Sequence, residues 1–587
     1  MKEQEHNQLY FELSTLIHTA IQEAYPGQIL EKSVIYHSLG PTPKVEMGQI
    51  AFPCFSLSKS LKQSPNLIAK SLHEKVEKSP AIIKSLVVGP YLNFFISHEY
   101  LGKNIITRIL SEEFFNDSVF ITPPNSMIEY SQPNTHKELH VGHMRNLCLG
   151  NSIVEILKYT KHKVYSVTYP GDVGTHVAKC LWYLNYHNQK EAPTERKGAW
   201  LGEMYSKANN LLEDQKGTDK EEFNRNELTE ILKQLESQEG EYFHRWKETR
   251  EWSISLMEEL YSWANISFDR WYWESELDSS SLNMAKKYYE EGIFTKSENA
   301  IGMDLSEDKL GFCMAIKSDG TGLYATKDIE LAQKKFKEYD IDNNLYVVDK
   351  RQSHHFKQVF KVLEKINFKN AKDCHHLEYD FVELPDGAMS SRKGNIIPIM
   401  TLIEQMESTI KSEYLDKYTN EWSAKQIEDT AKIIANGAIK YGMLRMDNSR
   451  KIVFEMADWL KLDGETGPYL QYVYARINSL EKKLDIKIGL EEQNWKLLND
   501  PSELNIMIKL SLFNSVTALS ATQYRPSVIC SYLYELGKLF NNFYAKCPIK
   551  NSGDVELSSA RLALAISVGK TMKSGLKLLG IQAPEQM

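Results

Sequence analysis

The stretch MIEYSQPNTHKELHVGHMRNLCLGNSIVEILKYTKHKVYSVTYPGDVG, residues 127–174, decides the fold class. It opens with a short apolar run typical of a buried strand, crosses a polar loop, and continues over residues 143–160 with helical periodicity. A second strand-like run, residues 162–170, ends in the turn GDVG. Strand, helix and strand in this order open a parallel, doubly wound sheet, so we predict an α/β domain.

Three regions are expected along the chain. Residues 1–120 combine an amphipathic opening helix with short strand-like runs, which indicates a compact α+β domain. Residues 121–410 continue the strand–helix alternation of a Rossmann-type sheet, interrupted over about 185–300 by a charged segment that we predict to be a helical insertion. Residues 411–587 show a succession of helical patterns and predict an all-α bundle.

Composition restricts the class of protein. The 587 residues are 42% hydrophobic and 25% charged, proportions that exclude a fibrous or disordered chain. The sequence has no uninterrupted apolar run of about 18 residues, and the first residues lack the basic flank of an export signal. The seven cysteines are scattered, which fits a reducing compartment, so we expect a cytoplasmic protein with no membrane partner. The net charge of −8 argues against non-specific coating of nucleic acid, but not against an enzyme with a local basic face.

The first candidate site is His140-Val141-Gly142-His143, where the first strand leads into the helix. At the carboxyl end of a parallel strand, a glycine lets a nucleotide approach the backbone, and the amino end of the next helix favours negative charge. Two histidines can then donate hydrogen bonds to phosphate oxygens where charge develops. The four letters alone are a weak signal, since two ordinary histidines can also begin a helix.

The second candidate site is Met389-Ser390-Ser391-Arg392-Lys393-Gly394-Asn395, which follows a strand-like run and precedes a helical one. A Ser/Arg/Lys/Gly loop can clamp a triphosphate transiently, because both cations can follow a leaving pyrophosphate. A solvated basic loop has the same composition. The occurrence of both motifs in this order is therefore the discriminating observation.

HVGH and MSSRKGN resemble the HIGH and KMSKS signatures of the class I aminoacyl-tRNA synthetases. The stretches EYSQPNTHKELHVGHMRN, KSDGTGLYATKDI and LDGETGPYLQYVYARINSL resemble arginyl-tRNA synthetases in particular, and the similarity covers nearly the whole chain. It implies an arginine–tRNA ligase that makes arginyl-adenylate and pyrophosphate from arginine and ATP, then transfers arginine to the 2′-hydroxyl of the terminal ribose of its tRNA. It also implies a monomer that takes up Mg²⁺ with its ATP and activates arginine only when tRNA is bound.

The resemblance assigns roles to individual residues. The guanidinium of arginine would lie at Glu274, Tyr324 and Asp328, and its α-amino and carboxylate ends at Glu129, Asn134 and Gln352. Carboxylates held in a fork are the acceptors that distinguish a planar guanidinium from the ammonium of lysine. The ATP-binding residues would be His140, His143, Met389, Ser390, Ser391 and Lys393, with His140, Gly142, His143, Lys137, Arg392 and Lys393 acting in catalysis.

Two lysines are candidates for steadying the pyrophosphate. The usual second signature begins with lysine where this chain has Ala388, and Lys393 is displaced by one or two places from the signature's second lysine. Relatives with a degraded loop carry a compensating lysine just before HIGH, where this chain has Lys137. We expect Lys393 to act in the transition state and Lys137 to bind ground-state phosphate as well.

The carboxy-terminal helices resemble the anticodon-binding bundle of the same family, and the amino-terminal domain is expected to touch tRNA too. Aromatic and basic residues interleave in GPYLQYVYARINSL and LGKLFNNFYAKCP, which suits stacking on splayed bases. Most aromatics at helical spacing belong to a core. Tyr472, Arg476 and Tyr544 are the individual candidates for RNA contact.

Other hypotheses are weighed against this one. A synthetase for lysine, cysteine or glutamate, a small-molecule nucleotidyltransferase with HxGH, or an RNA-binding protein with an inactive catalytic domain would each share part of the pattern. A carboxylate-lined pocket disfavours glutamate, and the nucleotidyltransferase leaves both ends of the chain without a role. His136 and His140 are four apart but do not form HExxH and have no third ligand in sight. The side chains of the adjacent pairs His354-His355 and His375-His376 diverge on a regular element. No protein-bound zinc is therefore expected.

Overall fold

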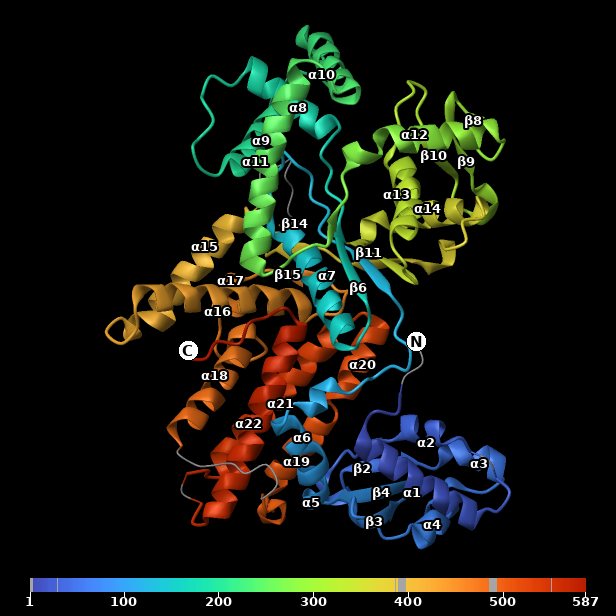
Figure 1. The fold of residues 1–587 in the computed structure, drawn as a ribbon, viewed down its shortest axis with the longest axis vertical. Helices are drawn as coiled ribbons and strands as arrows, with labels where there is room; N and C mark the ends of the chain where they lie inside the picture. Colours follow the sequence, from blue (N-terminus) through green and yellow to red (C-terminus); the bar gives the residue numbers. More distant parts are fainter. Residues whose placement is uncertain (1–3, 29, 386, 389–396, 485–492, 551) are drawn as a thin grey trace. The chain divides into compact units, whose positions relative to one another are not determined.

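The computed structural model describes residues 4–28, 30–385, 387–388, 397–484, 493–550 and 552–587. The chain forms two compact units. One is the continuous segment Pro124–Lys461, and the other joins Met1–Pro123 to Leu462–Met587. Figure 1 shows the elements of each unit.

The unit Pro124–Lys461 is built on a five-stranded parallel sheet of order β12-β11-β5-β6-β7. Its strands are β5 (Ser126–Glu129), β6 (Val164–Thr168), β7 (Arg270–Trp271), β11 (Asn343–Asp349) and β12 (Cys374–Tyr379). The chain winds from β5 to β6 on one side and later returns to β11 on the other. The order therefore reverses at β5, and the carboxyl ends of β5 and β11 border the crevice where such sheets bind ligands. The predicted doubly wound fold is confirmed.

Helix α7 (Val141–Tyr159) is buried along most of its length, because it packs on the sheet and is covered by α16 (Ala424–Leu444). α16 also packs against α15 (Ile399–Ile410). These helices therefore belong to the unit of the parallel sheet, which extends to Lys461, beyond the expected boundary at 410. The sequence boundary lay where strand-like runs stop, whereas the contacts of the sheet unit continue past it through α16.

The segment between β6 and β11 contains helices first and strands afterwards. Helices α8 (Thr175–Tyr186), α9 (Lys197–Asp214), α10 (Lys220–Ser237) and α11 (Glu241–Ala264) surround an apolar core of their own (Figure 1). The chain then returns to the parallel sheet through β7, so this group of helices ends at Ala264 and the expected 185–300 insertion is not continuous. A two-residue strand such as β7 is too short for hydrophobic periodicity to reveal.

Helix α12 (Glu274–Glu290) leads into a small antiparallel sheet of β8 (Thr295–Ser297), β9 (Ala300–Asp304) and β10 (Phe312–Ile316). β10 is the apolar run FCMAI, which pairs antiparallel with β9 and not with the parallel sheet. The chain continues with α13 (Tyr324–Glu338), then β11, and then α14 (Ser353–Lys365). The amino ends of α12, α13 and α14 all bring residues to the same crevice.

The other unit joins the two ends of the chain. Its amino-terminal part packs α1 (Gln8–Ala24), α2 (Lys32–Ser38), α3 (Phe55–Leu61) and α4 (Pro65–Lys75) around an antiparallel sheet of order β1-β2-β4-β3. The strands are β1 (Gly40–Pro41), β2 (Ile50–Pro53), β3 (Ile82–Val88) and β4 (Tyr91–Ile96). This is the predicted α+β domain.

The carboxy-terminal part of that unit contains α18 (Gly467–Lys483), α19 (Pro501–Ser511), α20 (Phe513–Gln523), α21 (Ser527–Lys546) and α22 (Val555–Leu578), the predicted all-α bundle. The bundle packs directly against the amino-terminal part. Asn7 Nδ2 donates to the Ser511 carbonyl at 3.0 Å, and Asn514 Nδ2 donates to the Phe114 carbonyl at 3.0 Å. A Cβ added at Gly102 would lie 2.0 Å from the Trp495 ring, so glycine is required there for close packing.

Over the described ranges, no single helix has the length and apolar composition needed to cross a membrane. The bent pair of α19 and α20 meets both criteria together, as core helices often do.

Candidate active site

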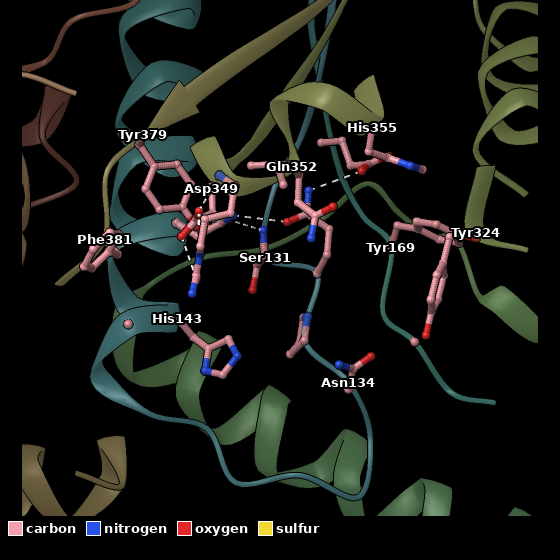
Figure 2. A pocket seen from close by; sticks show the side chains of 18 of the residues that line it. Ser131, Asn134, His143, Tyr169, Tyr324, Asp349, Gln352, His355, Tyr379 and Phe381 are labelled. Atoms are coloured by element: carbon pink, nitrogen blue, oxygen red, sulfur yellow. Dashed lines mark hydrogen bonds and ion pairs between the residues drawn. The ribbon is translucent and has the colours of Figure 1, made fainter. Parts of the chain in front are cut away.

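A pocket of about 700 Å³ opens at the carboxyl ends of β5, β11 and β12. Nine residues predicted for the site line it: Glu129, Asn134, His140, Gly142, His143, Glu274, Tyr324, Asp328 and Gln352. Figure 2 shows His143 and Tyr324 at opposite ends of the pocket, with Asn134 between them. The sheet thus gathers into one cavity residues that are spread over more than 200 positions of the sequence.

The HVGH segment forms the amino end of α7. The Gly142 N–H donates to His140 Nδ1 at 3.1 Å, and the His140 N–H donates to His143 Nδ1 at 3.1 Å. A ring nitrogen that accepts a hydrogen bond carries no proton, so each neutral ring carries its proton on Nε2. Both rings line the pocket, and each therefore has one Nε2–H available to donate.

Burial keeps both histidines uncharged. Burial, and then the nearby cation Arg351, lower the pKa of His140 to about 4. Burial and the neighbouring His140 lower the pKa of His143 well below its ordinary value. At neutral pH this end of the pocket consists of two neutral donors at the positive end of a long helix, an arrangement that suits phosphate oxygens.

The MSSRKGN residues Met389, Ser390, Ser391, Arg392 and Lys393 lie outside the described residues, but both flanks of this segment are described. On the downstream side, the Val141 N–H donates to the Ile397 carbonyl at 3.3 Å, and the Ile399 N–H donates to the Leu139 carbonyl at 2.9 Å. On the upstream side, β14 (Gly387–Ala388) pairs with β13 (Val382–Leu384), whose first residue lines the pocket. Backbone hydrogen bonds therefore join the downstream flank of the second motif to the first.

The opposite end of the pocket is acidic. Glu274 opens α12, and Tyr324 and Asp328 lie in the first turns of α13. Lys327 Nζ lies 3.8 Å from Glu274 Oε2, yet burial outweighs this cation and raises the pKa of Glu274 to about 7. A carboxyl group with a raised pKa lacks compensating charge in its ionised form. A further cation placed between Glu274 and Asp328 would supply that charge.

The middle of the pocket is formed by Glu129, Asn134 and Gln352. Glu129 is buried and pairs with the fully buried Lys335 of α13, and Gln132 Nε2 donates to Glu129 Oε1 at 3.2 Å. A Cβ added at Gly171, in the GDVG turn, would lie 2.4 Å from Asn134 Oδ1 and 3.4 Å from Glu274 Oε1. The glycine therefore lets two of the predicted site residues approach the turn.

Sequence reasoning missed the residues that hold the carboxylates. His355 Nε2 donates to Asp328 Oδ2 at 2.5 Å, and Lys335 pairs with Glu129. Asp172 accepts from the Ser275 N–H at 2.9 Å and from Arg250 Nε at 2.8 Å, so it caps α12 beside Glu274. Each partner is distant along the chain. Only Asp172, in the GDVG turn, lies in a motif from which the sequence could have predicted a site residue.

Lys137 does not line the pocket. Its Nζ lies 5.2 Å from the centre of the Tyr205 ring on α9, within range of a cation–π contact. The pyrophosphate role of Lys137 stays a prediction.

The three candidates for RNA contact lie in the other unit. Tyr472 and Arg476 are four residues apart on α18, so they share one face of that helix, and Tyr472 is 39% exposed. Arg476 Cζ lies 4.2 Å from the ring centre of Tyr544 on α21. The bundle thus brings Arg476 and Tyr544 together, with Tyr472 one helical turn away.

Within the described ranges, no group of three or more His, Cys, Asp or Glu side chains is arranged to hold a metal ion. Of the two adjacent histidines on α14, His354 is exposed and His355 binds Asp328. The expectation of no protein-bound zinc stays a prediction.

Comparison with known families gives three matches in chain order. The amino-terminal domain model of arginyl-tRNA synthetases matches residues 12–96, the class I tRNA synthetase (R) catalytic domain matches residues 107–456, and the DALR anticodon binding domain matches residues 470–587. The catalytic-domain match covers more than half of the chain and agrees with the sheet order and the position of HVGH. The chain is a class I aminoacyl-tRNA synthetase.

Individual relatives narrow the class further. An arginine–tRNA ligase of Bdellovibrio bacteriovorus is 51% identical, over 99% of this chain and 100% of its own length. One of Treponema denticola is 34% identical, over 93% of this chain and 94% of its own. The solved structure of Thermus thermophilus arginyl-tRNA synthetase is 25% identical and matches with a TM-score of 0.79, over 98% of this chain and 99% of the other. The chain belongs to the arginyl-tRNA synthetase family.

Proposed function

We propose that the two ends of the pocket divide the substrates of arginine activation between them. Family membership makes the chain an arginine–tRNA ligase of translation, with ATP, arginine and tRNA as substrates. The triphosphate of ATP would lie at the HVGH end and the guanidinium of arginine between Glu274 and Asp328. The observation that carries this assignment is the charge difference between the ends, since neutral N–H donors line one end and buried carboxylates the other.

In the first step, an oxygen of the arginine carboxylate attacks the α-phosphorus of ATP. A new O–P bond forms, the bond to the β-phosphate oxygen breaks, and pyrophosphate leaves with its electron pair. His140 and His143 would donate from Nε2 to the phosphate oxygens on which charge develops. They would act without changing protonation state, because burial keeps both rings neutral. Mg²⁺ bound with the ATP would neutralise part of the phosphate charge.

Arginine would be oriented by the middle and the acidic end of the pocket. Asn134 and Gln352 would contact the α-carboxylate, and Glu129 the α-amino group. Tyr324 would stand beside the guanidinium with the two carboxylates. Lysine would leave part of this fork unpaired, and unpaired buried carboxylates disfavour the wrong amino acid.

In the second step, the 2′-hydroxyl of the terminal tRNA ribose attacks the carbonyl carbon of the adenylate. An ester bond to arginine forms, the bond from that carbon to the phosphate oxygen breaks, and AMP leaves as the hydroxyl proton is released. We assign chemistry to residues 121–410, tRNA contact to residues 1–120, and anticodon contact to the helical bundle within residues 411–587, with Tyr472, Arg476 and Tyr544 as candidates. The shared unit of the two chain ends supports their contact with one RNA.

We further propose a cytoplasmic monomer that has no membrane partner. The arginine assignment is tested by pyrophosphate exchange with each amino acid, with and without tRNA. Exchange is expected with arginine only, and only when tRNA is present. Exchange with a different amino acid would contradict the assignment of the acidic end, and full exchange without tRNA would contradict the tRNA requirement.

A further inference from the structure

The carboxylate of Asp328 is held from one side. His355, on α14 and labelled in Figure 2, donates from Nε2 to Asp328 Oδ2 at 2.5 Å, and both residues line the pocket. Within the described residues no other side chain lies within hydrogen-bonding distance of this carboxylate, so Oδ1 receives no hydrogen bond from them. Both side chains are partly buried, with exposed fractions of 24% for His355 and 18% for Asp328.

The contact fixes the direction of the carboxylate. An aspartate near a helix start can adopt more than one side-chain rotamer, and each rotamer presents a different oxygen to the pocket. A hydrogen bond to Oδ2 from a second helix selects one of them. The ring of His355 is itself packed edge-on against Phe356, with ring centres 5.5 Å apart, so the donor has a defined orientation.

We propose that His355 is a positioning residue for arginine. Its Nε2–H holds Asp328 Oδ2 so that Oδ1 remains available to the guanidinium, and the protonated form of His355 competes with the guanidinium for the charge of Asp328. This inference rests on the proposed role of Asp328. It adds a consequence that the role alone does not have, because arginine binding then expels a proton from His355.

The competition follows from charge. Burial alone would lower the pKa of His355, but the hydrogen bond to Asp328 raises it above its ordinary value of 6.5. Without arginine, His355 therefore keeps its proton, and its positive charge, to a higher pH than an ordinary histidine does. A guanidinium bound at Asp328 repels that charge and favours the neutral ring. Arginine should bind more weakly as the pH falls through this range, because a bound proton must first be lost.

The other groups around the pair determine how this effect is measured. They are Tyr169, Cys313, Tyr324 and Tyr346, whose pKa values are raised by burial, His376, whose pKa is lowered by burial, and the charged Lys327, Asp349 and Arg351. The raised pKa values keep the tyrosines and the cysteine uncharged near neutral pH, and the lowered pKa of His376 favours its neutral ring. Glu274 is the exception, since its pKa is raised to about 7, and its protonation also weakens arginine binding at lower pH. The contribution of His355 is therefore the difference between the wild type and a variant that cannot titrate.

The decisive variant is His355→Gln, in which an amide N–H2 can still donate to Asp328 but carries no titrating proton. kcat and KM for arginine and for ATP are measured in tRNA charging with the full-length enzyme between about pH 6 and 8.5. The wild-type KM for arginine should rise toward low pH more steeply than the KM of His355→Gln. The extra rise caused by one proton is at most about tenfold per pH unit. The KM for ATP should show the same profile in both proteins.

His355→Ala removes the anchor altogether. Its KM for arginine at high pH should exceed that of His355→Gln by about tenfold, the effect of one hydrogen bond to a charged group, with kcat nearly unchanged. His354→Gln is the matched control, because His354 is the exposed neighbour on the same helix and does not line the pocket. It should keep the wild-type pH profile. Thermal unfolding of all three variants reports whether they fold.

Three results would overturn the inference. The pH profiles of wild type and His355→Gln could coincide, the loss in His355→Ala could fall on kcat or on the KM for ATP, or His354→Gln could shift the profile as much as His355→Gln. Failure of the underlying assignment looks different. If Asp328→Asn binds arginine normally, the proposed arginine site is wrong. If Asp328→Asn binds arginine weakly while His355→Gln keeps the wild-type pH profile, only the inference about His355 is wrong.

Discussion

The two ends of the active-site pocket are built in opposite ways. At the HVGH end, three residues of one short segment hydrogen-bond one another, and the backbone N–H groups of His140 and Gly142 fix both histidine tautomers. At the acidic end, each carboxylate depends on a partner from another element. Asp328 is held by His355, Glu129 by Lys335, and Glu274 by its position next to the Asp172 cap of α12.

The difference teaches what each end requires of the protein. The neutral N–H donors proposed to meet phosphate oxygens cost little to bury once hydrogen-bonded. Carboxylates that await a cation are costly to bury, and partners from distant elements offset part of that cost. Substitutions should therefore separate the two ends, with ATP parameters reporting on one and arginine parameters on the other.

The largest effect is expected from Asp328→Asn. This change keeps the volume but removes the charge that would face the guanidinium. Transition-state binding of arginine should fall by about 2–5 kcal/mol, the scale of a lost buried charge pair, while the KM for ATP changes little. Steady-state kcat/KM for arginine in the charging reaction measures it. An unchanged value would remove Asp328 from the arginine site.

The next effect distinguishes Lys393 from Lys137. Lys393→Ala should lower kcat for activation about 10²-fold, the scale of one lost electrostatic donor in the transition state. Lys137→Ala should lower kcat/KM for ATP and raise its KM as well. Single-turnover adenylate formation separates the two. Normal formation in Lys393→Ala together with abolished formation in Lys137→Ala would reverse the two roles.

A smaller effect is expected from Gly171→Ala. The new methyl group would lie 2.4 Å from Asn134 Oδ1, and it must displace a side chain of the arginine site. The displacement should cost about 1–3 kcal/mol, seen as a higher KM for arginine with the KM for ATP nearly constant. Gly40→Ala is the control, because nothing lies within 4 Å of its added Cβ. A rise in the KM for ATP equal to that for arginine would mean that the two ends are not separable.

The smallest effect concerns pH at the HVGH end. The pKa of His140 is lowered to about 4, so the ring stays neutral from alkaline pH down to mildly acid pH and becomes protonated only near that value. The KM for ATP should therefore vary little between about pH 6 and 8.5, while that for arginine rises toward the acid side. A parallel rise in both would show that the histidines titrate in the working range.

Because the two ends of the chain form one unit, deletion of the amino-terminal domain is a poor test of its contact with tRNA. Deleting residues 1–120 to test tRNA contact would also remove the partners of Ser511, Asn514 and Trp495 in the bundle. Loss of tRNA binding would then report on folding as well as on contact. Tyr472→Ala is the cleaner change, since this side chain is partly exposed and its loss should weaken tRNA binding by about 1–3 kcal/mol if a base stacks on it.

Much of the fold could be predicted from the sequence because its signals are local. The strand at 126–129, the helix at 141–159 and the strand at 164–168 are visible as runs and periodicities. The two-residue strand β7 and the sheet membership of β10 could not be predicted, since the pairing of a short strand depends on its neighbours in space. The boundary at Lys461 could not be predicted either, because the sequence of α16 predicts a helix whichever unit it packs in.

The sequence by itself predicted nine of the residues that line the pocket and the motif that is proposed to donate to phosphate. A hydrogen bond between a backbone N–H and a side chain two or three residues away follows from the local conformation at a helix start. Only the tertiary structure decided which groups hold the carboxylates, because each carboxylate and its partner are far apart in the sequence. The separation is 27 residues for Asp328 and His355, 103 for Asp172 and Ser275, and 206 for Glu129 and Lys335. Among 70 lysines and arginines and 16 histidines, nothing in the chain order selects the one that a buried carboxylate will meet, and the packing of the sheet and its helices makes that selection.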